Sequence, residues 1–247
     1  MTEYLIRTAT AEDIPFLIDV VVAASKSNSD KLGLSTLFNV PEVKVREIIG
    51  SMFEQDIDEC EFSISSFLIT EYHGTPVAAV GGWVEGLTQK IPSSTLKANL
   101  INFCFPKESI AFVLTTSRMI SDILIERENL SLQIEYVYVD KNHRGKGLAE
   151  GLIRQHIAKA LSACPELKKV QVQLFGNNTP AIRLYEKSGF HVEKIFTSNN
   201  ARILDYLPHY QTVLMEIDIT QEPLEHTSDI MKAGGQNNGK NRTSGKN

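Results

Sequence analysis

The sequence predicts a mixed α/β (α+β) protein, because β-prone runs alternate with amphipathic segments along most of the chain. The run "LSLQIEYVYVD" ends just before "GLAEGLIRQHIAKALSA", whose apolar residues recur at helical spacing. Two further apolar runs flank His73-Gly74-Thr75 and indicate a hairpin.

The expected elements follow one another in a definite order. We expect strands at residues 3–9, 65–86 (the hairpin), 130–140, 168–175, 190–196 and 211–219. We expect helices at residues 10–25, 41–55, 147–163 and 179–189. Residues 86–130 are less regular, with a helix beginning near residue 92 and another candidate at 108–128, where β-branched residues weaken the helical pattern.

The composition excludes several classes of protein. The hydrophobic fraction of 42% and charged fraction of 22% are ordinary for a soluble globular protein, and no apolar run is long enough to span a membrane. A formal net charge of −5 disfavours nucleic-acid binding. Three scattered cysteines argue against a disulfide framework or a zinc site, and the N-terminus lacks the pattern of a signal peptide. We therefore expect a cytoplasmic protein.

Residues 144–147, Arg-Gly-Lys-Gly, lie where the expected strand turns into the expected helix. Glycine weakens both kinds of element, so this stretch makes a tight turn or binds a ligand. A P-loop is excluded, because Asp140 stands where that motif needs a glycine and Gly147 follows the lysine. A dinucleotide motif is disfavoured, because the next strand ends in Phe-Gly-Asn at 175–177 instead of an acid.

Two interpretations of this glycine turn remain, a tight turn without a ligand and a pyrophosphate cradle. Unpaired backbone N–H groups at a helix N-terminus attract phosphate, and Gly145 and Gly147 would let its oxygens approach the backbone. Arg144 and Lys146 place positive charge where the helix dipole disfavours it. These cations favour the cradle.

Two motifs resemble the signatures of the GNAT N-acetyltransferase superfamily. Residues 144–149 (RGKGLA) are similar to R-x-x-G-x-G/A and follow a strand that ends in Val-Asp. Residues 178–190 (NTPAIRLYEKSGF) are similar to N-x-x-A-x-x-L-Y-E-K-x-G-F. The resemblance covers residues 133–196, and the preceding order of strand, helix, helix and hairpin also fits. Residues 86–130 and the C-terminal tail do not fit the family pattern.

The resemblance implies a single GNAT domain in residues 1–222. Its central sheet would be mixed, mostly antiparallel and twisted, with about seven strands, helices on both faces, and a splay between strands 4 and 5. Residues 86–130 would form a helical insertion between strands 3 and 4. Residues 223–247 are too polar to form a core, so we expect a disordered tail there.

The resemblance also implies transfer of an acetyl group from acetyl-CoA to an amine by direct attack, without a metal. The backbone of Val137, Tyr138 and Val139 would bind pantetheine and polarise the thioester, and Asn178 would contact the cofactor arm. The residues that would hold the pyrophosphate are Arg144, Gly145, Lys146, Gly147, Leu148 and Ala149.

Two side chains match the family's acid and base. Tyr185 matches the tyrosine that protonates the departing thiolate, although an amphipathic helix can equally bury a tyrosine in the core. Glu135 matches the glutamate proposed as base in spermidine/spermine acetyltransferases; alternatively, it is an exposed strand residue paired with a lysine. Strand alternation would put Glu135 on one face with Val137 and Val139, unless a bulge changes the phase.

The sequence therefore predicts an acetyl-CoA-dependent N-acetyltransferase that acts on a primary amine of a small molecule or a peptide. The alternative is a degenerate member that binds acyl-CoA as a sensor or interaction module. Retention of both Tyr185 and Glu135 favours the enzyme, because a sensor needs only the cradle. No nucleic-acid or membrane partner is expected, a homodimer is left open, and the acceptor is not readable from the sequence.

Overall fold

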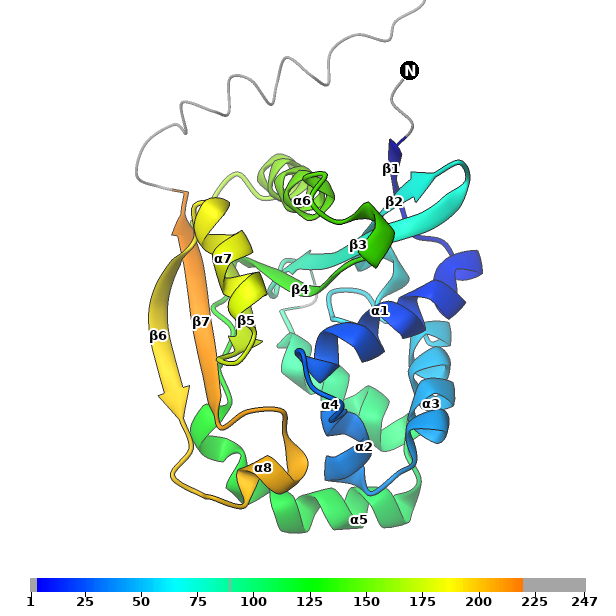
Figure 1. The fold of residues 1–247 in the computed structure, drawn as a ribbon, viewed down its shortest axis with the longest axis vertical. Helices are drawn as coiled ribbons and strands as arrows, with labels where there is room; N and C mark the ends of the chain where they lie inside the picture. Colours follow the sequence, from blue (N-terminus) through cyan, green and yellow to red (C-terminus); the bar gives the residue numbers. More distant parts are fainter. Residues whose placement is uncertain (1–3, 89, 220–247) are drawn as a thin grey trace, which may run out of the picture.

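The computed structural model describes residues 4–88 and 90–219 (Figure 1). A sheet of seven strands crosses the molecule in the order β1-β2-β3-β4-β5-β7-β6. All neighbouring strands are antiparallel except β4 and β5, which are parallel. This confirms the expected mixed, mostly antiparallel sheet. The strands are β1 (Tyr4–Thr8), β2 (Phe67–Tyr72), β3 (Thr75–Val84), β4 (Ser131–Val139), β5 (Lys169–Phe175), β6 (His191–Thr197) and β7 (Gln211–Asp218).

Helices cover both faces of the sheet (Figure 1). One buried cluster joins the sheet to the N-terminal helices and to the helices between β3 and β4, and a second joins it to α6 and α7. The helices are α1 (Ile14–Lys26), α2 (Gly33–Phe38), α3 (Glu42–Glu54), α4 (Ser93–Cys104), α5 (Lys107–Thr116), α6 (Leu148–Ala163), α7 (Thr179–Lys187) and α8 (Ile203–Tyr206). None of the helices in the described ranges is both long and apolar enough to cross a membrane.

The chain between β3 and β4 differs in detail from the sequence prediction. The second candidate helix ends at Thr116, and two short 3₁₀ turns follow it at Ser117–Met119 and Ser121–Ile123. The hydroxyls of Thr115, Thr116 and Ser117 each donate to a carbonyl three residues earlier, which competes with regular helical bonding. The expected C-terminal tail lies outside the described residues.

The sheet opens between β4 and β5, as expected. Parallel pairing joins only Ser131–Ile134 to Lys169–Val172, and beyond Ile134 β4 has no β5 partner. On its other edge, β4 carries one extra residue, because Tyr138 pairs with Ala79 while Glu135 pairs with Gly81. Tyr136 has φ of 49°, a left-handed conformation that tyrosine rarely adopts. A β-bulge therefore lies where the strands separate.

Candidate active site

The bulge in β4 sets the direction of the Glu135 side chain. Glu135 lies opposite Gly81, where an added Cβ would lie 3.2 Å from an aromatic ring in the core under the N-terminal helices. Val137 and Val139 pack instead against the core under α6. The three residues therefore do not share a face: the bulge that the sequence left open is present, and the extra residue at Tyr136 reverses the alternation.

Glu135 belongs to a group of inward-facing charges. Its Oε1 accepts a 2.9 Å hydrogen bond from Arg127 Nη2, which also lies 3.4 Å from Glu61 Oε1. Lys97 Nζ lies 2.6 Å from that Glu61 oxygen. Burial raises the pKa of Glu135, and the cation of Arg127 opposes the rise without cancelling it. A carboxylate with a raised pKa is suited to accept a proton near neutral pH.

Tyr185 lies in the core, with only 4% of its surface exposed. Its ring packs edge-on against Phe190, with ring centroids 5.4 Å apart. Burial raises the pKa of its hydroxyl, and the negative charge of Glu135 adds to that rise. The hydroxyl therefore stays protonated at neutral pH, and the two predicted catalytic side chains lie within electrostatic range of each other. Its role as an acid stays a prediction.

The glycine turn forms the start of α6. Gly145 and Gly147 both have φ of 74°, a conformation that glycine adopts without strain, and an added Cβ at either position would meet no atom within 4 Å. Gly147 is the N-cap, and the first helical bond runs from Gly151 N to its carbonyl. Leu148 and Ala149 therefore occupy the first turn, whose N–H groups point beyond the helix end. This geometry suits an anion.

The two cations of the turn extend in different directions. Arg144 Nε donates to the Val139 carbonyl at 3.1 Å, which ties the turn to the end of β4. Lys146 Nζ donates to the Tyr4 hydroxyl at 2.7 Å, and that hydroxyl lies 3.0 Å from His143 Nδ1. Strand β1 thus braces the glycine turn from the side.

Asn178 caps helix α7. Its Oδ1 accepts from Ala181 N at 3.4 Å and from Asn28 Nδ2 at 3.0 Å. The neighbouring Asn177 donates to the Ser27 carbonyl at 2.9 Å. These contacts, which we call the asparagine clasp, join the end of α1 to the loop between β5 and α7. The sequence predicted the cap; contact of Asn178 with a cofactor stays a prediction.

Sequence reasoning missed the charged partners of Glu135. Glu61 and Arg127 lie 66 residues apart and belong to segments without a regular pattern. The available signal was Glu61 between Cys60 and Phe62 in "ECEFSIS", which does not indicate a partner. Trp83, on the neighbouring strand β3, is buried, with 5% of its surface exposed.

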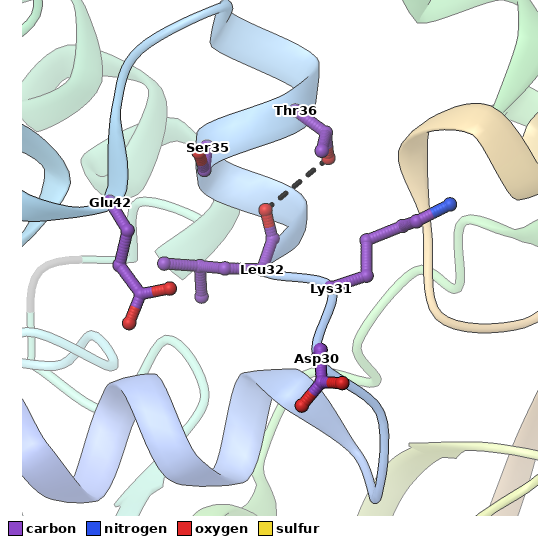
Figure 2. A pocket seen from close by; sticks show the side chains of 6 residues that line it. All are labelled: Asp30, Lys31, Leu32, Ser35, Thr36 and Glu42. Atoms are coloured by element: carbon purple, nitrogen blue, oxygen red, sulfur yellow. Dashed lines mark hydrogen bonds between the residues drawn. The ribbon is translucent and has the colours of Figure 1, made fainter.

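A surface pocket of about 330 Å³ lies on the N-terminal helices, away from β4 (Figure 2). Its lining comes from the loop after α1, from α2 and from the start of α3: Asp30, Lys31, Leu32, Ser35, Thr36 and Glu42. None of the predicted site residues lines this pocket, so it does not define the active site.

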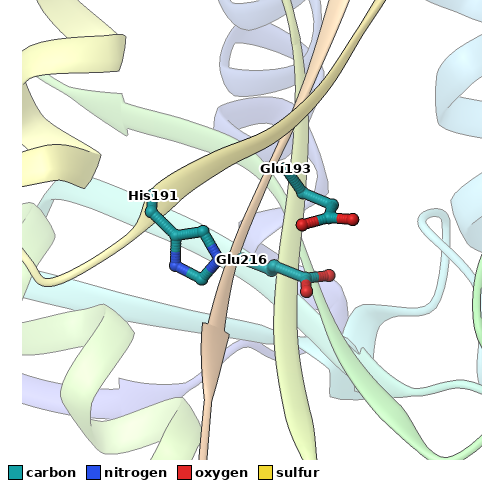
Figure 3. A group of neighbouring side chains, drawn as sticks. All are labelled: His191, Glu193 and Glu216. Carbon is teal, nitrogen blue, oxygen red and sulfur yellow. The ribbon is translucent and has the colours of Figure 1, made fainter.

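One group of side chains on β6 and β7 has the composition of a metal site (Figure 3). Ligand atoms of His191, Glu193 and Glu216 lie within 4.8 Å of one another. However, Glu216 already pairs with Lys169 at 3.1 Å and accepts from Gln171 at 3.2 Å. A metal would have to compete with these partners, and we assign none to this group.

Comparison with known proteins decides the family. The model of the Acetyltransferase (GNAT) family matches residues 41–190, which is more than half of the chain. The chain belongs to the GNAT acetyltransferase family. The match includes β4, the glycine turn, α6 and α7, so the two motifs noted in the sequence lie within it.

Individual acetyltransferases resemble this chain over shorter stretches. A probable spermine N(1)-acetyltransferase of Bacillus subtilis subsp. natto is 29% identical over 82 residues, 32% of this chain and 51% of that protein. A streptothricin acetyltransferase of Escherichia coli is 40% identical over 57 residues, 23% of this chain and 32% of that protein. The chain thus matches about half of the length of the first of these relatives.

A solved structure supports the fold over nearly all of the chain. An N-acetyltransferase from Staphylococcus aureus Mu50 superposes with a TM-score of 0.58 at 15% identity, over 86% of this chain and 100% of that chain. At this identity the likeness concerns the fold alone.

Proposed function

We propose that this GNAT protein transfers the acetyl group of acetyl-CoA to a primary amine of a small molecule or a peptide. The observation that carries the proposal is the unpaired edge of β4 beside the glycine turn. Beyond Ile134, one edge of β4 lacks a strand partner. Helix α6 follows its N-cap Gly147, and the N–H groups of its first turn have no partner within the helix. An extended amide chain that ends in a pyrophosphate has the chemistry to use both features.

Acetyl-CoA supplies an activated acyl group, and the residues of the chain would bind and orient it. The peptide groups of Val137, Tyr138 and Val139 would pair with the pantetheine arm in the way a neighbouring strand would. The turn from Arg144 to Ala149 would hold the pyrophosphate. Gly147 fits this role, because an added Cβ there would point into open space.

The acid and base of the proposal rest on burial and charge. An amine near its ordinary pKa of ~10.4 is protonated at neutral pH and must lose a proton before attack. Glu135, with a raised pKa, is the proposed base. Tyr185 is the proposed acid for the departing thiolate, since its hydroxyl holds its proton at neutral pH.

The alternative function is binding of acyl-CoA without turnover. The unpaired edge of β4 and the glycine turn would serve that function equally well. The pKa values of Glu135 and Tyr185 are both raised, and the charge of Glu135 acts on Tyr185. This favours the enzyme, because titratable groups with shifted pKa values are typical of catalytic sites.

A thiol-release assay tests the proposal. Purified protein is incubated with acetyl-CoA and, in separate reactions, polyamines, aminoglycosides, amino acids and peptides with free N-termini, and CoA affinity is measured by calorimetry. CoA binding with release above that of reactions without protein or without acceptor, for at least one class, supports the enzyme. Binding without release in any class supports the sensor, and absence of CoA binding overturns both.

A further inference from the structure

The chain between β3 and β4 reaches the site through Arg127. The side chain of Arg127 is 12% exposed and extends from the chain between β3 and β4, just before β4 begins. Its Nη2 donates to Glu135, its Nη1 lies 3.1 Å from Ser93 Oγ at the start of α4, and its guanidinium lies over the Trp83 ring, 5.0 Å from the centroid. The guanidinium is therefore fixed from several sides.

Trp83 itself is held in place by a further carboxylate. Glu85 accepts from Trp83 Nε1 at 3.0 Å with one oxygen and from Ser93 N at 2.7 Å with the other. Strand β3 and helix α4 thus share the platform under Arg127. The guanidinium of Arg127 is therefore contacted at once by the aromatic face of Trp83, by the Ser93 hydroxyl and by two carboxylates, those of Glu61 and Glu135.

The two carboxylates that share Arg127 have different surroundings. Glu61 is 1% exposed and pairs with both Arg127 and Lys97, so its pKa is lowered although burial opposes this. Glu135 is 18% exposed, and its pKa is raised by burial, with the negative charge of Glu61 adding to the rise. In catalytic sites, two neighbouring titratable groups often have pKa values shifted in opposite directions, so that one accepts a proton while the other stays charged.

We propose that Arg127 is a positioning residue for Glu135: together with Glu61, it fixes the orientation of the Glu135 carboxylate and sets the pH at which that carboxylate accepts a proton. This inference rests on the proposed function only in naming Glu135 as the base. It gives the segment between β3 and β4 a role on the catalytic side of the sheet.

The sign of each effect follows from the charges that act on Glu135. Those that come from other elements are Arg127, Glu61 and Lys97, while the nearby phenols of Tyr185 and Tyr136 stay neutral because their pKa values are raised. Removing the cation of Arg127 raises the pKa of Glu135. Removing the anion of Glu61 lowers it, and leaves Arg127 with the anions of Glu135 and, further off, Glu85. The two substitutions therefore shift the titration in opposite directions.

The first measurement needs no acceptor. The full-length protein is labelled with ¹³C at the glutamate side-chain carboxyl, and the Glu135 resonance is identified by its loss in Glu135→Gln. We expect Arg127→Met to move the titration midpoint up by about one pH unit or more, and Glu61→Gln to move it down by a similar amount. Arg118→Met, an exposed arginine of the same segment, should leave the midpoint unchanged.

Arg127→Met leaves two carboxylates close together and can unfold the protein, so Glu61→Gln is the safer arm of the test. Circular dichroism and CoA affinity confirm the fold of each variant. Midpoints that coincide with the wild type in the folded variants overturn the proposal, and so does a shift of the same sign in both.

The second measurement separates this proposal from the proposed function. With an accepted amine, the rising limb of the pH–rate profile should follow the NMR midpoints in Arg127→Met and Glu61→Gln. If Glu135→Gln leaves the profile unchanged while the midpoints move as expected, the base assignment fails but the electrostatic role of Arg127 stands. If Glu135→Gln removes the limb and the midpoints do not move, the role of Arg127 fails.

Discussion

The buried histidine of α6 should make the protein acid-sensitive. His156 is 4% exposed, and its Nε2 donates to the Val80 carbonyl at 2.9 Å. Burial lowers the pKa of His156 from its ordinary 6.5 to about 4. In the unfolded chain the imidazole takes up a proton near pH 6.5, while in the folded chain it stays neutral until about pH 4. Between these values the unfolded state binds more protons, so stability falls as the pH falls.

The size of this effect follows from the two pKa values. At about 1.36 kcal/mol per pKa unit, the full loss is about 3 kcal/mol, complete below pH 4. By pH 5, about 2 kcal/mol should already be lost relative to pH 7.5. Other groups also titrate in this range, so the effect of His156 has to be isolated by comparison with a variant.

His156→Gln provides that comparison, because glutamine can still donate to the Val80 carbonyl but does not titrate. Urea unfolding, followed by circular dichroism at pH 7.5 and pH 5, gives the free energy of unfolding for each protein. The wild type should lose about 2 kcal/mol more than His156→Gln over this interval. His73→Asn, an exposed histidine in the β2–β3 turn, serves as the control and should behave like the wild type. An equal loss in wild type and His156→Gln would refute the reasoning.

Three further predictions concern packing, the glycine turn and the proposed acid. An added Cβ on Gly82 would lie 2.7 Å from the His156 ring, so Gly82→Ala should destabilise the protein by about 1–3 kcal/mol. Gly151→Ala should not destabilise it, because an added Cβ there meets no atom within 4 Å. Thermal unfolding of both variants checks this prediction. Gly147→Asp should weaken CoA binding at least about tenfold more than Gly147→Asn, because only the former adds negative charge; equal affinities in calorimetry would contradict this. Tyr185→Phe should reduce turnover by roughly 10²-fold with unchanged CoA affinity, and full turnover with chemistry rate-limiting would leave Tyr185 a packing residue.

The local signals in the sequence located most of the elements. Asn178 and Gly189 bracket α7 as a cap and a stop, and Gly189 has the expected positive φ of 94°. Helix α2 escaped prediction, because it has only six residues and begins at Gly33 without a side-chain cap. Such an element is held by its tertiary packing rather than by its own sequence.

The site was less predictable than the fold, because its geometry is not local. The bulge depends on a left-handed tyrosine, Tyr136, at a position where the sequence reads as regular strand. Strand alternation alone therefore could not fix the face of Glu135, and its role as the base stays a prediction. Arg127 and Glu61 meet because the starts of β2 and β4 both pair with the end of β3, and no periodicity in one segment indicates a partner in the other.

The short seam between β4 and β5 has a mechanical consequence. The two parts of the sheet are joined there by pairing over Ser131–Ile134, and β4 extends five residues further, roughly 16 Å at about 3.3 Å per residue. A rotation of about 5° around the seam would thus displace the far end by roughly 1.4 Å, half a hydrogen-bond length. At that end the parts are joined by the asparagine clasp, whose hydrogen bond between Asn28 and Asn178 is exposed and can exchange partners with water at low cost. A small widening of the sheet would therefore cost less at the open ends of β4 and β5 than at their paired residues.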